Sequence, residues 1–169
     1  MNENKVVEIA KNIYIISEDS VYDVIDRLKH TQNIDQTLAY VYVKAFYMHC
    51  VQKYYSIKNN QEDFNQIYNE YKNNLKEYYK NNNSGISEDL LNDILQMFDK
   101  SYEFLETLQF KDINDSYAFR HHTIDCMELL RRMLENKSKS QIREDIFDNS
   151  IRILKEKAEE ILDYIRKIG

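Results

Sequence analysis

The sequence contains no proline and only two glycines, Gly85 and Gly169. Sheet proteins need several tight turns, and such turns favour Gly, Pro and the pairs Asn-Gly or Asp-Gly. Neither pair occurs in this chain. The scarcity of turn residues therefore argues against a sheet fold and predicts a few long helices joined by short loops.

Cysteine and long apolar runs are scarce as well. Cys50 and Cys126 lie far apart and do not follow the spacing of a metal-binding motif. No stretch approaches the roughly 20 apolar residues that a membrane span requires. The apolar run at 13–16 is too short for a secretion signal. We therefore expect a cytoplasmic protein with reduced thiols and no membrane contact.

The 169 residues fit one domain of ordinary size, 1–169. The net charge of −6 opposes the phosphate attraction on which most nucleic-acid binding depends, so we do not expect nucleic acid as a partner. No glycine-rich phosphate loop is present. The abundant Tyr, Asn, Lys and Ile are typical of an AT-rich genome, which indicates a low-GC bacterium or one of its mobile elements.

Hydrophobic periodicity predicts an all-α bundle of five to six helices. Residues 34–57 are apolar most of the way round, which predicts a central buried helix. Residues 141–168 predict a long C-terminal amphipathic helix. Residues 2–16 fit a helix or a strand, and we favour a helix because no other segment offers a strand partner. The polar run at 17–20 predicts an N-terminal cap for a separate helix over 21–30.

Loops are expected where Asn, Asp and Ser cluster, at 59–63, 81–85 and 111–116. Ser87 is the expected N-cap of the helix that follows the second loop, and Asp115 or Ser116 of the helix that follows the third.

The last helix carries an apolar residue alternately every four and three positions over about three heptads. This pattern is typical of a helix face that packs inside a bundle, and also of a seam between two copies of a chain. Both interpretations stay open at this point, and the second makes the seam a candidate interaction surface. Its residues are Phe147, Ile151, Leu154, Ala158, Ile161, Ile165 and Ile168.

The segment 86–113 carries nearly the whole excess of negative charge. It is either a face that docks a basic partner or an ordinary solvated helix face. The candidate interaction residues in it are Asp93, Asp99, Glu103 and Glu106.

The segment 119–134 places two histidines, an aspartate and a cysteine within two helical turns. Side chains four residues apart share a helix face, so His122 pairs with Cys126. These two could bind a metal such as zinc together with His49 or Cys50 of the central helix. Against this, a cysteine on an apolar helix face usually behaves as a small hydrophobic residue.

The same spacing pairs His121 with Asp125, which could act as a general base and its orienting carboxylate. The pair is equally an ordinary surface contact, and no nucleophile stands near it. The sequence therefore favours a non-enzymatic interaction module without a cofactor, which binds another protein or itself, for example as a regulator or inhibitor. The alternative is a metal-dependent hydrolase-type enzyme built on the His, Asp and Cys residues of the bundle, with His49, His121, His122 and Asp125 at its centre.

Overall fold

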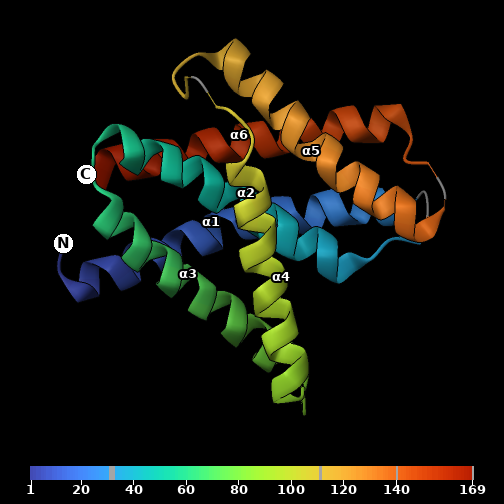
Figure 1. Ribbon diagram of the computed structural model, residues 1–169, viewed down its shortest axis with the longest axis horizontal. Coiled ribbons are helices and arrows are strands. Elements are labelled where there is room, and N and C mark those ends of the chain that lie inside the picture. The colour runs from blue at the N-terminus through green and yellow to red at the C-terminus, as the bar shows by residue number, and fades with distance from the viewer. Residues whose placement is uncertain (31–32, 111, 140, 169) are drawn as a thin grey trace.

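The computed structural model describes residues 1–30, 33–110, 112–139 and 141–168, which form six α-helices and no strand (Figure 1). The predicted all-α bundle is confirmed. Within these ranges no helix is both long and apolar enough to cross a bilayer. The helices are α1 (Glu3–Lys29), α2 (Gln36–Ile57), α3 (Gln61–Asn82), α4 (Glu88–Glu106), α5 (Ser116–Ser138) and α6 (Glu144–Ile168).

Helix α2 is the centre of the bundle, as the sequence predicts. It packs against each of the other five helices, and α4 crosses in front of it in Figure 1. Every side chain in the range 38–51 is buried, so this part of α2 has no face open to water. Polar groups on α2 must therefore find their hydrogen-bond partners inside the protein.

Helix α1 corrects one prediction. The helix is continuous through the run at 17–20, so the expected cap and the separate helix over 21–30 are wrong. The hydroxyls of Ser17 and Ser20 donate to the carbonyls of Tyr14 and Ser17, three residues earlier in the same helix. These serines are buried against α2, where Lys44 and Tyr47 form hydrogen bonds with their hydroxyls. The polar run can therefore lie inside a helix, although its sequence pattern is typical of a helix start. The helical interpretation of 2–16 is confirmed from Glu3 onward.

The predicted caps explain where two helices begin. The Ser87 side chain accepts a hydrogen bond from the Leu90 amide at the start of α4. Asp115 accepts from the amides of Tyr117 and Ala118 at the start of α5. Of the predicted loop at 111–116, the first residue, Lys111, lies outside the described residues. Gly85, between α3 and α4, has a φ of 78°, a left-handed conformation that costs glycine little.

Helix α6 places its heptad seam inside the bundle, against α1, α2 and α5. Burial of the seam in the chain's own core leaves it unavailable as a contact between two copies of this folded chain. Of its residues, Phe147, Ile151, Leu154, Ala158, Ile161 and Ile165 are buried, and Ile168 is partly buried.

Replacement of Leu154 by Ala tests this packing. Leu154 is 0% exposed, so the loss of its side chain leaves a cavity, and we expect the free energy of unfolding to fall by about 3 kcal/mol. Urea denaturation followed by circular dichroism measures the change. The control Arg152→Ala removes an exposed ion pair with Glu156. The free energy of unfolding should then change by no more than about 0.5 kcal/mol. Equal stabilities of the two variants would contradict internal packing of the seam.

Candidate functional site

Two buried polar clusters are built on α2. The first, called the lysine cluster here, consists of Lys44, Glu18, Ser17, Tyr14 and Tyr40. The Lys44 side chain is fully buried, and its Nζ lies 2.5 Å from Glu18 Oε2. The same Nζ donates to Ser17 Oγ at 2.7 Å and to the Tyr14 carbonyl at 2.9 Å. All three donors of the ammonium group therefore have acceptors on α1.

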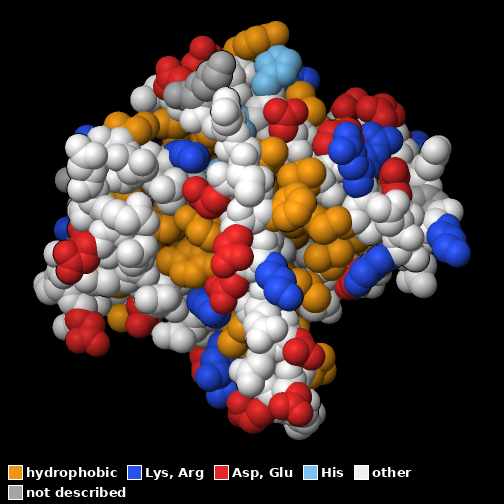
Figure 2. Space-filling view, in the orientation of Figure 1, with side chains coloured by type: hydrophobic (Ala, Val, Ile, Leu, Met, Phe, Trp, Pro, Cys, Tyr) orange, Lys and Arg blue, Asp and Glu red, His pale blue; other side chains and the backbone are white. Residues whose placement is uncertain are grey.

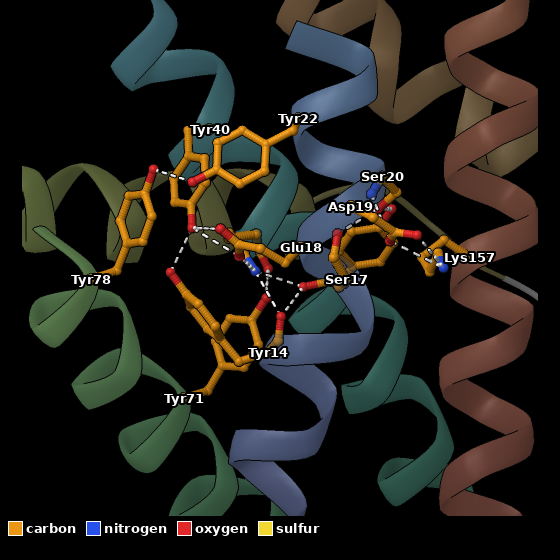
Figure 3. Close-up of polar contacts among 12 residues, drawn as sticks. Tyr14, Ser17, Glu18, Asp19, Ser20, Tyr22, Tyr40, Tyr71, Tyr78 and Lys157 are labelled. Atoms are coloured by element: carbon orange, nitrogen blue, oxygen red, sulfur yellow. Dashed lines mark hydrogen bonds and ion pairs between the residues drawn. The ribbon is translucent and has the colours of Figure 1, made fainter. Parts of the chain in front are cut away.

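Tyrosines complete the lysine cluster, as Figure 3 shows for Tyr14, Tyr40 and Glu18. The Tyr40 hydroxyl lies 2.8 Å from Glu18 Oε1 and 2.7 Å from the Tyr14 hydroxyl. Lys44 Nζ also sits 3.5 Å from the centre of the Tyr14 ring, a cation–π contact. The Tyr71 hydroxyl of α3 donates to the Lys44 carbonyl at 3.0 Å. Burial raises the pKa of both Tyr14 and Tyr40, so their hydroxyls stay protonated at neutral pH.

Burial also lowers the pKa of Lys44 to about 8, although the attraction and hydrogen bond of Glu18 oppose this change. The cluster is well supplied with hydrogen bonds, which favours a structural role. Sequence reasoning missed it, but one signal was present: Lys44 is the one Lys, Arg, Asp or Glu in the largely apolar stretch 38–51 of the central helix.

The second cluster, called the histidine cluster here, joins α2 to α5. His49 Nε2 of α2 lies 2.6 Å from His122 Nε2 of α5, and Cys126 Sγ lies 3.4 Å from that same His122 atom. The three ligand atoms all lie within 4.8 Å of one another. His49, His122 and Cys126 are 0%, 4% and 0% exposed. The metal-binding hypothesis required a second helix to bring a ligand to His122, and α2 does so with His49.

Neighbouring side chains fix the rings of the histidine cluster. Glu106 Oε1 of α4 lies 2.7 Å from His49 Nδ1, and a carboxylate can only accept there, so His49 Nδ1 carries a proton. Glu106 Oε2 lies 3.9 Å from Lys53 Nζ. The Phe110 ring stacks on the His122 ring at a centroid distance of 4.1 Å and an angle of 3°.

Burial controls the charge of the histidine cluster. It lowers the pKa of His122 to about 3, with His49 and Lys53 adding to the effect and the Gln109 backbone opposing it. Burial likewise raises the pKa of the Cys126 thiol. Among the described residues, His122 Nδ1 is one of two buried polar side-chain atoms without a hydrogen-bond partner. His122 and Cys126 are therefore uncharged at physiological pH, and His122 Nδ1 lacks a hydrogen-bond partner.

The structure does not assemble the predicted acid–base pair. His121 and Asp125 are both exposed on the outer face of α5, and within the described part of the chain no hydrogen bond joins them. The His121 ring instead packs edge-on against Tyr117 at 4.4 Å. Cys50 is buried but is not among the residues whose ligand atoms converge. Of the residues predicted for a hydrolase, His49 and His122 are therefore buried in the bundle. His121 and Asp125 lie on the solvent-exposed face of α5.

The predicted acidic face also divides. Asp99 lies 2.5 Å from Lys72 Nζ and accepts a hydrogen bond from Tyr68, both on α3. Glu106 contacts His49, as described above. Only Asp93 and Glu103 of the four candidates are exposed. The segment is thus not one continuous acidic surface.

An apolar groove lies beside α4 and is called the α4 groove here. Its volume is about 380 Å³, and its walls come from α2, α4 and α5. Phe104, in its wall, is 54% exposed, and Figure 2 shows hydrophobic side chains gathered along both flanks of α4. The apolar lining residues are Leu38, Tyr42, Met97, Phe104 and Met133, and the polar ones are Asp93, Gln96, Lys100 and Ser101.

No family model matches the chain, and no curated protein or solved structure matches it significantly. The features of this chain that bear on its function are the lysine cluster, the histidine cluster and the α4 groove.

The low pKa of Lys44 makes stability depend on pH. Between about pH 8 and the ordinary lysine pKa of 10.5, the unfolded chain binds a proton that the folded chain has lost. Stability therefore rises with pH across this window. Relative to the variant Lys44→Met, the wild type should gain up to ~3 kcal/mol by the top of the window. Urea denaturation at intervals from pH 7.5 to 10.5 measures this difference.

The comparison with a variant is necessary because other groups that face Lys44 titrate too. Glu18, Asp19, Tyr14, Tyr40 and Tyr71 are present in both proteins, so their contributions largely cancel. The variant Lys72→Met, which removes a partly exposed ion pair with Asp99, should keep the wild-type pH dependence. A Lys44→Met protein with that same dependence would disprove the role of the buried ammonium.

Proposed function

We propose that this chain is a non-enzymatic interaction module that binds a helix of a partner protein in the α4 groove. The observation that carries the proposal is Phe104, a large aromatic side chain more than half exposed in the wall of an apolar groove. Apolar grooves between helices are a common way to bind the apolar face of an amphipathic helix. A regulator or inhibitor of another protein would act through such a contact.

The rim of the groove indicates the chemistry of the partner. Asp93 and Lys100 lie along it, and the exposed Glu103 stands next to Phe104 in sequence on α4. Asp93 and Lys100 balance each other in the lining, so the net negative charge of the whole chain is what favours a partner helix with basic residues flanking its apolar face. The net charge of −6 also favours a positively charged partner protein and disfavours nucleic acid.

The two buried clusters support an interaction role over catalysis. The lysine cluster is occupied by its own hydrogen bonds, and the residues of the histidine cluster are almost entirely shielded from solvent. The exposed His121 and Asp125 make no hydrogen bond to each other in the described chain that would prepare a general base.

The variant Phe104→Asp tests the groove. It places a charge where we expect an apolar anchor of the partner, so capture of the partner should fall by roughly 30-fold or more, the effect of losing an interface hot spot. The experiment compares proteins captured from a lysate of the native host by wild-type and variant baits, quantified by mass spectrometry.

The matched control is Leu90→Asp. Leu90 is 52% exposed on the same helix but does not line the groove, and it stands about four turns away from Phe104. A partner that binds wild type and Leu90→Asp alike but not Phe104→Asp supports the proposal. Equal capture by all three baits would refute it. Sedimentation of wild type and Phe104→Asp tells whether the partner is a second copy of the chain.

A further inference from the structure

The histidine cluster presents three metal-ligand atoms to one point in the interior. They come from two helices that are distant in sequence, and all three side chains are buried. Spacing along α5 explains why His122 and Cys126 share a face, but it does not explain why His49 of α2 meets them there. The convergence therefore needs its own physical account.

Two ring nitrogens and one thiol sulfur face one another in this cluster. Glu106 accepts the Nδ1 proton of His49, so the other ring nitrogen, Nε2, is the one that His49 presents to His122. His122 can place its single proton on Nε2 to fill the 2.6 Å contact. His122 Nδ1 has no hydrogen-bond partner, and the Cys126 sulfur contacts the same His122 Nε2 atom that His49 contacts. A buried polar atom left without a partner is costly.

We propose that His49 Nε2, His122 Nε2 and Cys126 Sγ bind one zinc ion. Imidazole nitrogen and thiolate sulfur are donors that zinc prefers, and a zinc ion held by three protein ligands keeps its fourth position for water. This inference goes beyond the interaction role of the α4 groove and does not depend on it. On binding, a Zn–S bond forms, and the thiol proton of Cys126 passes to solvent.

One distance between ligand atoms already matches a tetrahedral zinc site, and binding requires the His49 ring to move relative to the other two ligands. With Zn–N bonds of about 2.0–2.1 Å and a Zn–S bond of about 2.3 Å, ligand nitrogens stand about 3.3 Å apart and sulfur stands about 3.5 Å from nitrogen. The Sγ–Nε2 distance of 3.4 Å between Cys126 and His122 already agrees. The two imidazole nitrogens, 2.6 Å apart, must separate by about 0.7 Å, which a small rotation of either ring provides.

Glu106 supplies the outer support that zinc-bound histidines usually have. A carboxylate that accepts the other ring proton fixes the tautomer and orientation of the histidine and raises its basicity. Glu106 has this geometry on His49, at 2.7 Å. It is a positioning residue, because its oxygen contacts the ring and not the proposed ion.

The test uses the full chain without a histidine tag, made metal-free with a chelator and titrated with zinc chloride or cobalt chloride. We expect one zinc ion per chain with a Kd below about 1 μM, measured by calorimetry. Cobalt should add the strong near-ultraviolet absorption of a thiolate–metal bond, which reports Cys126 directly. Zinc should also raise the thermal midpoint of unfolding, because it binds the folded chain.

Four variants separate the proposed ligands from their neighbours. Cys126→Ala keeps a small apolar side chain in the core, so it should fold but lose the thiolate absorption and bind zinc at least ~100-fold more weakly, as should His122→Ala. Glu106→Gln should weaken zinc binding by about 10–100-fold with the thiolate absorption retained. His121→Ala, which changes the adjacent exposed histidine, should bind as the wild type does.

Two results would overturn the inference. One is wild-type zinc binding with a Kd above about 1 μM. The other is a folded Cys126→Ala protein that keeps wild-type affinity. If His122→Ala does not fold, Cys126→Ala and the thiolate absorption of the wild type still decide the question.

Discussion

The burial of residues 38–51 of α2 on every face is the constraint on which the rest of the structure depends. A helix with no solvent-exposed side must have each of its polar groups satisfied by another helix, since an unpaired buried polar group costs as much as a lost hydrogen bond or more. Lys44, Tyr42 and His49 all lie in the fully buried stretch. Each therefore needs a hydrogen-bond partner from a neighbouring helix.

These demands explain features of the other helices that local rules do not. The Lys44 ammonium requires acceptors, and α1 supplies them from a polar stretch that would otherwise end a helix. Tyr42 finds the carbonyl of Cys126 on α5, and His49 finds Glu106 on α4. The removal of one partner from such a pair leaves the other buried and unsatisfied, so each contact favours this arrangement of helices over alternatives. The zinc proposal addresses a place where the demand is only partly met, because His122 Nδ1 has no hydrogen-bond partner among the described residues.

Sequence periodicity predicted much of this fold because helix faces and caps are local properties. The buried centre at 34–57, the caps Ser87 and Asp115 and the inward face of α5 all follow from spacing along one helix. Contacts between helices depend on topology, which spacing does not encode. That is why the polar run at 17–20 was misinterpreted as a helix start, and why the pairing of Lys44 with Glu18 was missed. For the same reason His122 was recognised as a candidate ligand while its meeting with His49 stayed open.

The histidine cluster and the α4 groove are built from the same three helices. Tyr42 lines the groove and donates its hydroxyl proton to the carbonyl of the proposed ligand Cys126. On α4, Phe104 of the groove stands two residues before Glu106, which orients His49. An ion that fixes α2 against α5 therefore also fixes two walls of the groove. If a partner helix prefers the fixed arrangement, zinc strengthens partner binding, and reciprocity requires the partner to strengthen zinc binding by the same factor. A buried zinc ion would then change the affinity of the α4 groove for its partner helix without contacting that helix, because it fixes the positions of α2 and α5.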